Sequence, residues 1–161
     1  MNLTIRPATI EDIPTILRFI IALARYEHLE HEVIATEKQL STSLFGDTPQ
    51  AEVLLAILDN SPVGFALFFS NFSTFIGKAG IHLEDLFVLP ENRGMGIGKQ
   101  LLLEIQRIAA HRGAGRLEWN VLDWNTPAIE FYQSMGARPV PDWITYRMTE
   151  KQLTQPGDNN A

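Results

Sequence analysis

A glycine-rich segment, Arg93-Gly94-Met95-Gly96-Ile97-Gly98-Lys99, constrains the fold of this chain more than any other feature. It follows an apolar strand-like run, Leu83 to Leu89, and it precedes an amphipathic helical pattern. Glycines let a backbone approach a ligand closely, and free amides at a helix start attract phosphate. Arg93 and Lys99 add positive charge. The segment therefore predicts a strand–loop–helix unit that binds a phosphate-bearing ligand. The alternative is a tight turn that simply needs glycines.

Two standard phosphate-binding motifs do not fit this segment. A P-loop has four residues between its first glycine and the Gly-Lys pair, and Ser or Thr follows the lysine. Here three residues separate Gly94 from Gly98, and Gln100 follows Lys99. A dinucleotide-binding fingerprint has the spacing G-x-G-x-x-G, whereas the third glycine here comes one residue early. Both motifs are therefore excluded.

The remaining hydrophobic patterns predict strands and helices in mixed order. The predicted strands are residues 2–6, 51–58, 63–69, 82–89, 117–122 and 143–148. The predicted helices are a first one after a capping box at Thr9 and Asp12, then 36–44, 97–109 and a short one between Thr126 and Gly136. Pro14 is expected to cost the first helix one hydrogen bond. This order predicts an α/β fold of the mixed (α+β) kind, a central twisted sheet flanked by about four helices.

Length and composition bound what such a chain can do. The 161 residues suit one domain, predicted over residues 1–153, with a polar tail at 154–161 expected to be disordered. No apolar run approaches the ~20 residues that span a bilayer, and no secretory signal opens the chain, so we expect a cytoplasmic protein. The absence of cysteine excludes disulfides, thiolate metal sites and cysteine nucleophiles. The net charge of −6 disfavours nucleic acid and favours cationic partners.

Two adjacent carboxylates, Glu84 and Asp85, lie within the apolar strand at 83–89. Adjacent strand residues face opposite sides of a sheet, so the two are expected to serve different faces. A carboxylate among apolar neighbours is costly unless it is paired or protonated, and burial raises its pKa. That environment suits a general base near neutral pH. Pairing with an arginine or lysine is the structural alternative for both residues.

The glycine segment after a strand ending Phe87-Val88, together with a later stretch from Trp124 to Tyr132 and with Gly136-Ala137, resembles the GNAT acetyltransferase superfamily. The resemblance implies a GNAT-like sheet and acetyl-CoA as co-substrate. The loop amides would hold the CoA pyrophosphate, and Tyr132 would donate a proton to the departing thiolate. The implied cofactor-binding residues are Leu86, Phe87, Val88, Arg93, Gly94, Met95, Gly96, Ile97, Gly98, Lys99, Asn125, Thr126, Pro127 and Ala128.

Further stretches resemble the spermidine/spermine (diamine) acetyltransferase branch, and the resemblance extends to about Lys151. They are Ile5 to Thr9, Tyr26-Glu27, Thr36 to Lys38, Leu83 to Asp85 and Trp124-Asn125. The branch implies a small cationic amine as acceptor and a homodimer, with neither nucleic acid nor membrane as partner. The implied acceptor-binding residues are Tyr26, Glu27, Glu84, Asp85, Glu118, Trp119 and Asn120.

The predicted mechanism is direct acetyl transfer in a ternary complex. A primary alkylamine arrives protonated, so a base, Glu84 acting through a water, must remove its proton. The backbone amide near Val88 would stabilise the oxyanion, and Tyr132 would act as acid. The alternative acceptor is thialysine or another lysine-like amino acid, and the alternative of another class is a non-catalytic CoA-binding module. His28 and His31, a pair without further ligands, and the lone His82 and His111 predict no metal.

Overall fold

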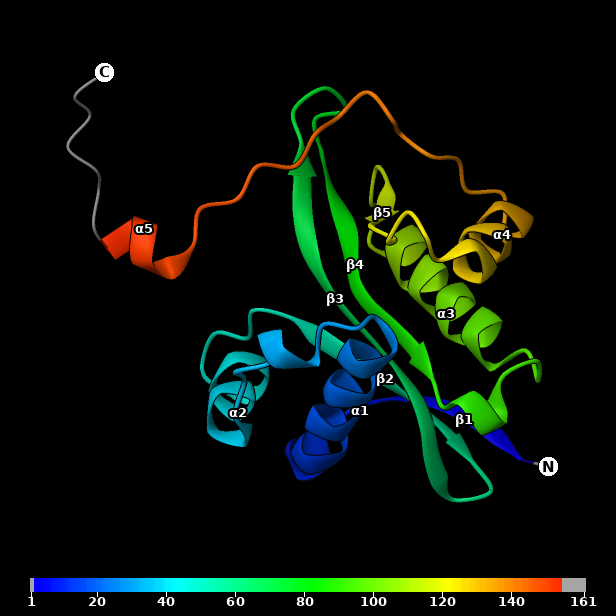
Figure 1. The fold of residues 1–161 in the computed structure, drawn as a ribbon. Coiled ribbons are helices and arrows are strands. Elements are labelled where there is room, and N and C mark those ends of the chain that lie inside the picture. Colours follow the sequence, from blue (N-terminus) through cyan, green and yellow to red (C-terminus); the bar gives the residue numbers. More distant parts are fainter. Residues whose placement is uncertain (1, 155–161) are drawn as a thin grey trace. The chain divides into compact units, whose positions relative to one another are not determined.

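The computed structural model describes residues 2–154 and contains one five-stranded sheet with helices on its faces (Figure 1). Contacts divide the chain into two units, Met1–Leu122 and Asp123–Ala161, and each is described by itself. No helix within the described range is long and apolar enough to cross a membrane.

The sheet belongs to the first unit and follows chain order, β1-β2-β3-β4-β5. Its strands are β1 (Leu3–Pro7), β2 (Glu52–Leu58), β3 (Ser61–Ser73), β4 (Lys78–Val88) and β5 (Leu117–Trp119). The first four strands pair antiparallel, and β5 pairs parallel to β4 over Ile81–Leu83. The predicted hairpin and its neighbours are confirmed, while the predicted strand at 117–122 is shorter than expected.

Three helices of the first unit cover the two faces of the sheet (Figure 1). They are α1 (Ile13–Tyr26), α2 (Glu37–Phe45) and α3 (Ile97–His111). On one face, Phe19 of α1 stacks on Phe65 of β3 at 5.7 Å, and Leu44 of α2 joins the same core. On the other face, Arg112 at the end of α3 lies over Phe68. Phe65 and Phe68 are three residues apart on β3, so they face opposite sides.

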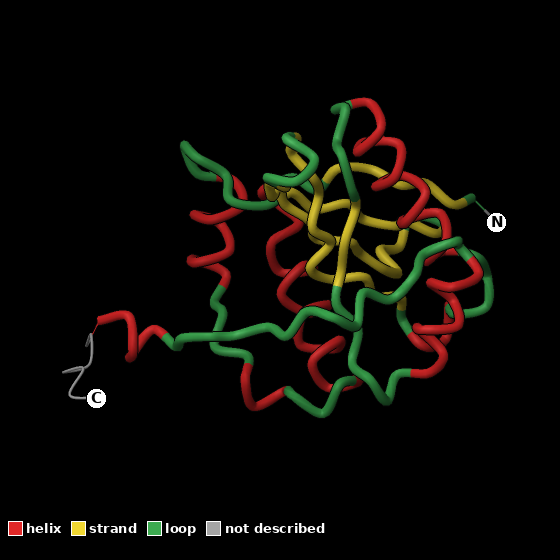
Figure 2. Tube along the Cα trace, turned by 90° about the horizontal axis from the view of Figure 1, so that it is seen from above, coloured by secondary structure: helices red, strands yellow, loops and turns green. Residues whose placement is uncertain are grey.

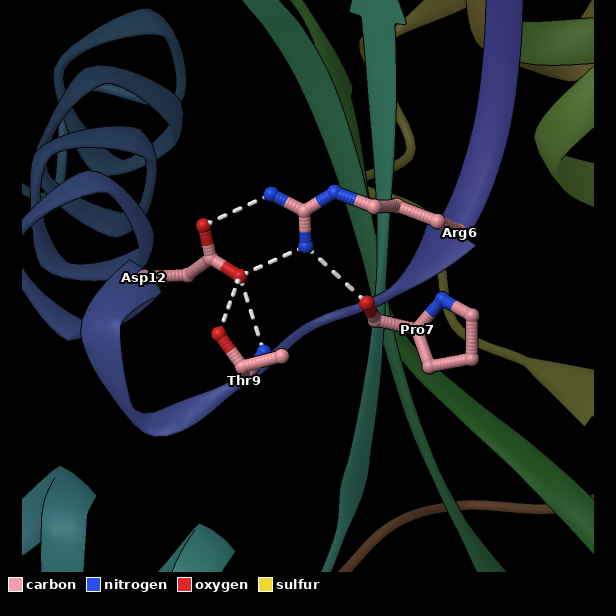
Figure 3. Close-up of polar contacts among 4 residues, drawn as sticks. All are labelled: Arg6, Pro7, Thr9 and Asp12. Atoms are coloured by element: carbon pink, nitrogen blue, oxygen red, sulfur yellow. Dashed lines mark hydrogen bonds and ion pairs between the residues drawn. The ribbon is translucent and has the colours of Figure 1, made fainter.

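The junction between β1 and α1 is fixed by a carboxylate and a guanidinium (Figure 3). Asp12 accepts hydrogen bonds from Arg6 Nη1 and Nη2 at 2.7 and 2.9 Å, and from the Thr9 backbone N–H at 2.8 Å. The predicted capping box is therefore present, and it closes a 3₁₀ turn over Ile10–Asp12. Pro14 is the second residue of α1, where no helical donor is needed, so the expected loss of a hydrogen bond does not occur.

The second unit contains two short helices, α4 (Thr126–Ser134) and α5 (Glu150–Thr154), and residues 137–149 between them carry no helix or strand (Figure 2). The predicted strand at 143–148 is therefore wrong. Its large apolar side chains, Trp143, Ile144 and Tyr146, are between 74% and 91% exposed. An alternating pattern becomes a strand when another strand pairs with it, and none of the described strands does so here. Thr154 ends α5, and residues 155–161 of the predicted tail lie outside the described residues.

Candidate active site

A β-bulge in β4 determines where the predicted carboxylates lie. Leu67 of β3 pairs with Asp85, but the next residue, Phe68, pairs with Leu83. Glu84 is therefore an extra residue in β4, and such a residue shifts the alternation of side chains by one position. Because Leu67 packs against the core under α1, its partner Asp85 lies on that face too.

The bulge overturns the expectation that Glu84 and Asp85 serve opposite faces. Glu84 Oε2 lies 3.5 Å from Nε2 of His82. His82 pairs with Phe69, which is two residues beyond Leu67 on β3 and so faces the same side. Both carboxylates therefore reach the face that α1 covers. The expectation of opposite faces holds for a regular strand, and the unpaired residue breaks that regularity here.

Asp85 is the half-buried carboxylate of the pair, whereas the sequence analysis placed the base at Glu84. Burial, together with the smaller effects of the negative charges of Glu84 and Glu27, raises the pKa of Asp85 to about 7. Glu27, the residue after α1, is half-buried as well, and burial raises its pKa. Glu84, by contrast, has a side chain that is 56% exposed. Near neutral pH such a group of carboxylates retains a proton or attracts a cation.

Arg93 connects the glycine-rich loop to the end of α1. Its Nε donates a hydrogen bond to the Val88 carbonyl oxygen at 3.0 Å. Its guanidinium carbon lies 4.5 Å from the centroid of the Tyr26 ring and 5.6 Å from that of Phe87. Arg93, which was predicted to supply positive charge for a phosphate, therefore also links the loop to Tyr26 and Phe87. Lys99 is exposed at the start of α3.

The glycines of the loop leave space that the protein itself does not fill. Gly94 and Gly96 have φ of +77° and +78°, a conformation that favours glycine, and a Cβ on either would meet no atom within 4 Å. Gly98 lacks a positive φ, and a Cβ there would meet Val88 Cγ2 at 3.8 Å, an ordinary contact. The backbone therefore does not require glycine at residue 98. This space is compatible with the predicted approach of a phosphate-bearing ligand to the first turn of α3.

The backbone amide of Val88 is free of β3. The Leu89 N–H donates to the Val63 carbonyl oxygen at 2.9 Å, and Val88 is the partner of Gly64. In an antiparallel pair, hydrogen-bonded and non-hydrogen-bonded positions alternate, so the Val88 N–H points to the other edge of β4. The described part of β5 pairs with that edge no further than Leu83. This amide, and that of Leu86 two residues before, can therefore donate to a ligand.

The three residues predicted along β5 differ in their contacts and in their exposure. Glu118 Oε2 lies 2.8 Å from Nε of Arg116, so its charge is compensated. Trp119 is half-buried at the end of β5, and Asn120 follows it and is exposed. Glu118 pairs in register with His82 of β4, so this strand lies next to the carboxylate cluster.

The other predicted residues, Asn125 to Ala128 and Tyr132, belong to the second unit. Asn125 is 7% exposed and caps α4, accepting a hydrogen bond from the Ala128 N–H at 3.4 Å. Thr126 and Pro127 form the first turn, with proline at a position that tolerates it. Tyr132 lies in the last turn of α4, and its ring is 5.3 Å from that of Phe131.

Sequence reasoning treated His82 as a lone histidine, but it contacts Glu84. The signal was available, because residues two apart on a strand share a face. The cation contact between Arg93 and Tyr26 joins residues 67 positions apart, so no local pattern predicts it. No group of three or more potential metal ligands occurs among residues 2–154.

Comparison with known proteins finds a matching family model and relatives that are named as acetyltransferases. The family model described as Acetyltransferase (GNAT) family matches residues 17–137. Thialysine N-epsilon-acetyltransferase of Bos taurus is 36% identical, over 94% of this chain and 95% of that protein. L-ornithine N5-acetyltransferase of Arabidopsis thaliana is 32% identical, over 92% of this chain and 85% of that protein. Among solved structures, an integron cassette protein of V. cholerae matches with a TM-score of 0.80 and 26% identity, over 97% of this chain and 98% of that one.

Proposed function

The chain belongs to the GNAT family and is an acetyl-CoA-dependent N-acetyltransferase, and on this premise we propose that its acceptor is the terminal amine of a small diamine or polyamine. The cluster formed by Glu27, Glu84 and Asp85 carries this proposal. The charges that act on Asp85 are both negative, and burial already disfavours its ionised form. An ammonium group is the ligand that relieves both costs.

A lysine-like diamino acid is the second candidate acceptor, because two relatives are named for thialysine and ornithine. Such an acceptor carries a carboxylate that needs a cation. Arg25 is already paired with Glu30 at 2.6 Å. Arg93, which lies over Tyr26 next to Glu27, fits this need better.

The proposed reaction is direct transfer, because the chain has no cysteine to carry an acyl group. Glu27 and Asp85 hold the ammonium, and Glu84, acting through a water, removes its proton. The amine attacks the thioester carbonyl, and the Val88 N–H stabilises the oxyanion. Tyr132 protonates the thiolate as it leaves. The glycine loop of the first unit and the start of α4 in the second are each proposed to supply contacts to acetyl-CoA.

The test is thiol release from acetyl-CoA with acceptors in matched pairs. Putrescine is ornithine without its carboxylate, and cadaverine is lysine without its carboxylate, so each pair isolates that group. Spermidine, spermine and thialysine complete the panel. A higher kcat/KM for the amine of each pair supports the diamine proposal, and a higher value for the amino acid selects the second candidate. Release with none of these acceptors would overturn both.

Two variants test the roles of individual residues. Tyr132→Phe keeps the ring and removes the proton donor, so kcat is expected to fall about a hundredfold while the KM for acetyl-CoA changes little. Glu84→Gln keeps the shape and removes the base, and its pH profile is expected to change. Full turnover of the first variant, or an unchanged profile of the second, would remove the corresponding role.

The homodimer implied by the family resemblance and the cytoplasmic location expected from the sequence belong to the same proposal. Sedimentation of the purified chain tests the first, because a dimer has twice the mass of 18.1 kDa. Fractionation of the source cells tests the second.

A further inference from the structure

His82 is a titratable group beside the proposed base, and its ring is held in place. The imidazole packs against the ring of Phe69, tilted by 32° with centroids 5.1 Å apart, and the His82 side chain is 19% exposed. Its Nε2 faces Glu84 Oε2 at 3.5 Å. Within residues 2–154, His82 is the ion-pair partner of the Glu84 carboxylate. The histidine therefore restricts where that carboxylate can lie.

The acceptor ammonium must lose a proton before it can attack, and the imidazole can accept that proton. An alkylammonium is a weak acid, and a carboxylate is a poor base for it. In water an imidazole is a stronger base than a glutamate carboxylate by about two pKa units. A proton that passes beyond the carboxylate to an imidazole therefore leaves the amine more favourably than one that stays on the carboxylate.

We infer that His82 is a positioning and proton-relay residue, which orients Glu84 and accepts from it the proton of the acceptor amine. This inference rests on the proposed function. An N–H bond of the ammonium breaks, and the proton reaches Glu84 through a water. It then moves to His82 Nε2, whose lone pair forms the new N–H bond. The electron pair left on the amine attacks the thioester. The imidazolium, next to the carboxylate, releases its proton to solvent through its exposed edge.

Carboxylates predominate among the titratable groups near His82. Glu84 and Asp85 lie on the same strand, and the charges of Glu84 and Glu27 act on Asp85. β3 brings no titratable residue. On β5, Glu118 pairs with His82 in register, and Arg116 compensates its charge.

Kinetics of His82→Gln test the relay with the best acceptor of the panel. The amide can still orient Glu84 but cannot take a proton, so kcat at pH 7 is expected to fall about tenfold to a hundredfold, with the acceptor KM little changed. The deficit should shrink toward pH 10, where the amine arrives unprotonated. A structural defect would leave it constant. The matched control is His111→Gln, at the exposed end of α3, which should keep wild-type kcat.

A second measurement needs no acceptor, so it separates this inference from the proposed function. The imidazole resonances of the four histidines are recorded by NMR, and His82→Gln assigns the peaks of interest. Glu84→Gln should shift the imidazole resonances of His82, whose Nε2 faces Glu84 at 3.5 Å, and leave those of His111 unchanged. Unchanged resonances of His82, or a pH-independent deficit of His82→Gln, would overturn the relay. Loss of all activity in the wild-type panel would instead count against the proposed acceptor.

Discussion

Two aspartates in the first unit have opposite environments. Asp12, between β1 and α1, accepts two hydrogen bonds from the guanidinium of Arg6, and these hold its pKa at about 2 (Figure 3). Asp85, on β4, has carboxylates for neighbours, and burial raises its pKa to about 7. At pH 7 the Asp12 carboxyl is therefore ionised, whereas the Asp85 carboxyl is about half protonated.

The difference separates a residue that stabilises the fold from one that we propose to bind a ligand. Asp12 has its partner within the chain, so its charge stabilises the folded protein. Asp85 lacks a cation among the charges that act on it, so folding is disfavoured when it ionises. Perturbed groups without internal partners are characteristic of functional sites.

The largest expected effect is a loss of stability with rising pH that depends on Asp85. In the unfolded chain this carboxyl ionises near pH 4, and in the folded protein it ionises near pH 7. Between these values the unfolded state releases a proton that the folded state keeps, so stability falls by up to about 4 kcal/mol. The free energy of unfolding of Asp85→Asn, relative to wild type, should rise by that amount from pH 4 to pH 8 in urea titrations. A constant difference would contradict the contrast.

The same substitution should reduce activity even though it stabilises the protein. Asp85→Asn removes the charge that is proposed to hold the acceptor ammonium, and kcat/KM for the acceptor is expected to fall about a hundredfold, or about 3 kcal/mol. Steady-state kinetics at pH 8 measure this effect, with the KM for acetyl-CoA as internal control. Wild-type kcat/KM in this variant would show that Asp85 is a structural residue like Asp12.

Asp12 should give the opposite pattern. Asp12→Ala is expected to lose about 1 to 2 kcal/mol of stability at pH 7, allowing for the exposure of Arg6, and to keep its activity. Because the pKa of Asp12 is lowered, this contribution is present above pH 4 and disappears as the pH falls through about 2. Chemical unfolding at pH 7 and pH 2 measures it, and a double-mutant cycle with Arg6→Gln isolates the pair. A difference that persists at pH 2 would argue against the ion pair as its source.

The smallest expected effect concerns Gly98, which, like Asp85, is proposed to serve ligand binding rather than stability. Gly98→Ala should gain up to about 1 kcal/mol, because alanine is the better helix former and its Cβ has room. The KM for acetyl-CoA should rise, because the methyl group occupies the approach to the helix start. Gly96→Ala is the matched control, since its φ of +78° makes alanine unfavourable and stability should fall. A stable Gly98→Ala enzyme with an unchanged KM would remove the cofactor argument for this glycine.

The sequence predicted what depends on local pattern. Three features depend on a few adjacent residues only, and the structure contains all of them: the strand at the apolar run 83–89, the helix after Gly96 and the capping box at Thr9. Features that depend on distant partners were missed. The bulge at Glu84 exists because of the register of β4 with β3, and the predicted strand at 143–148 lacked a partner. The roles of the site residues remain predictions.

The bulge also has a consequence for deletions in this chain. Removing residue 84 would leave Asp85 opposite Leu67 and Leu83 opposite Phe68, so the rest of β4 would keep its faces and pair regularly with β3. The strand would lose the Glu84 carboxylate and the local bend that a bulge causes, while His82 and Asp85 stayed on the face that α1 covers. A deletion at this one position therefore spares the packing on both faces of β4, whereas a deletion within the regular part of the strand would turn every residue beyond it to the opposite face.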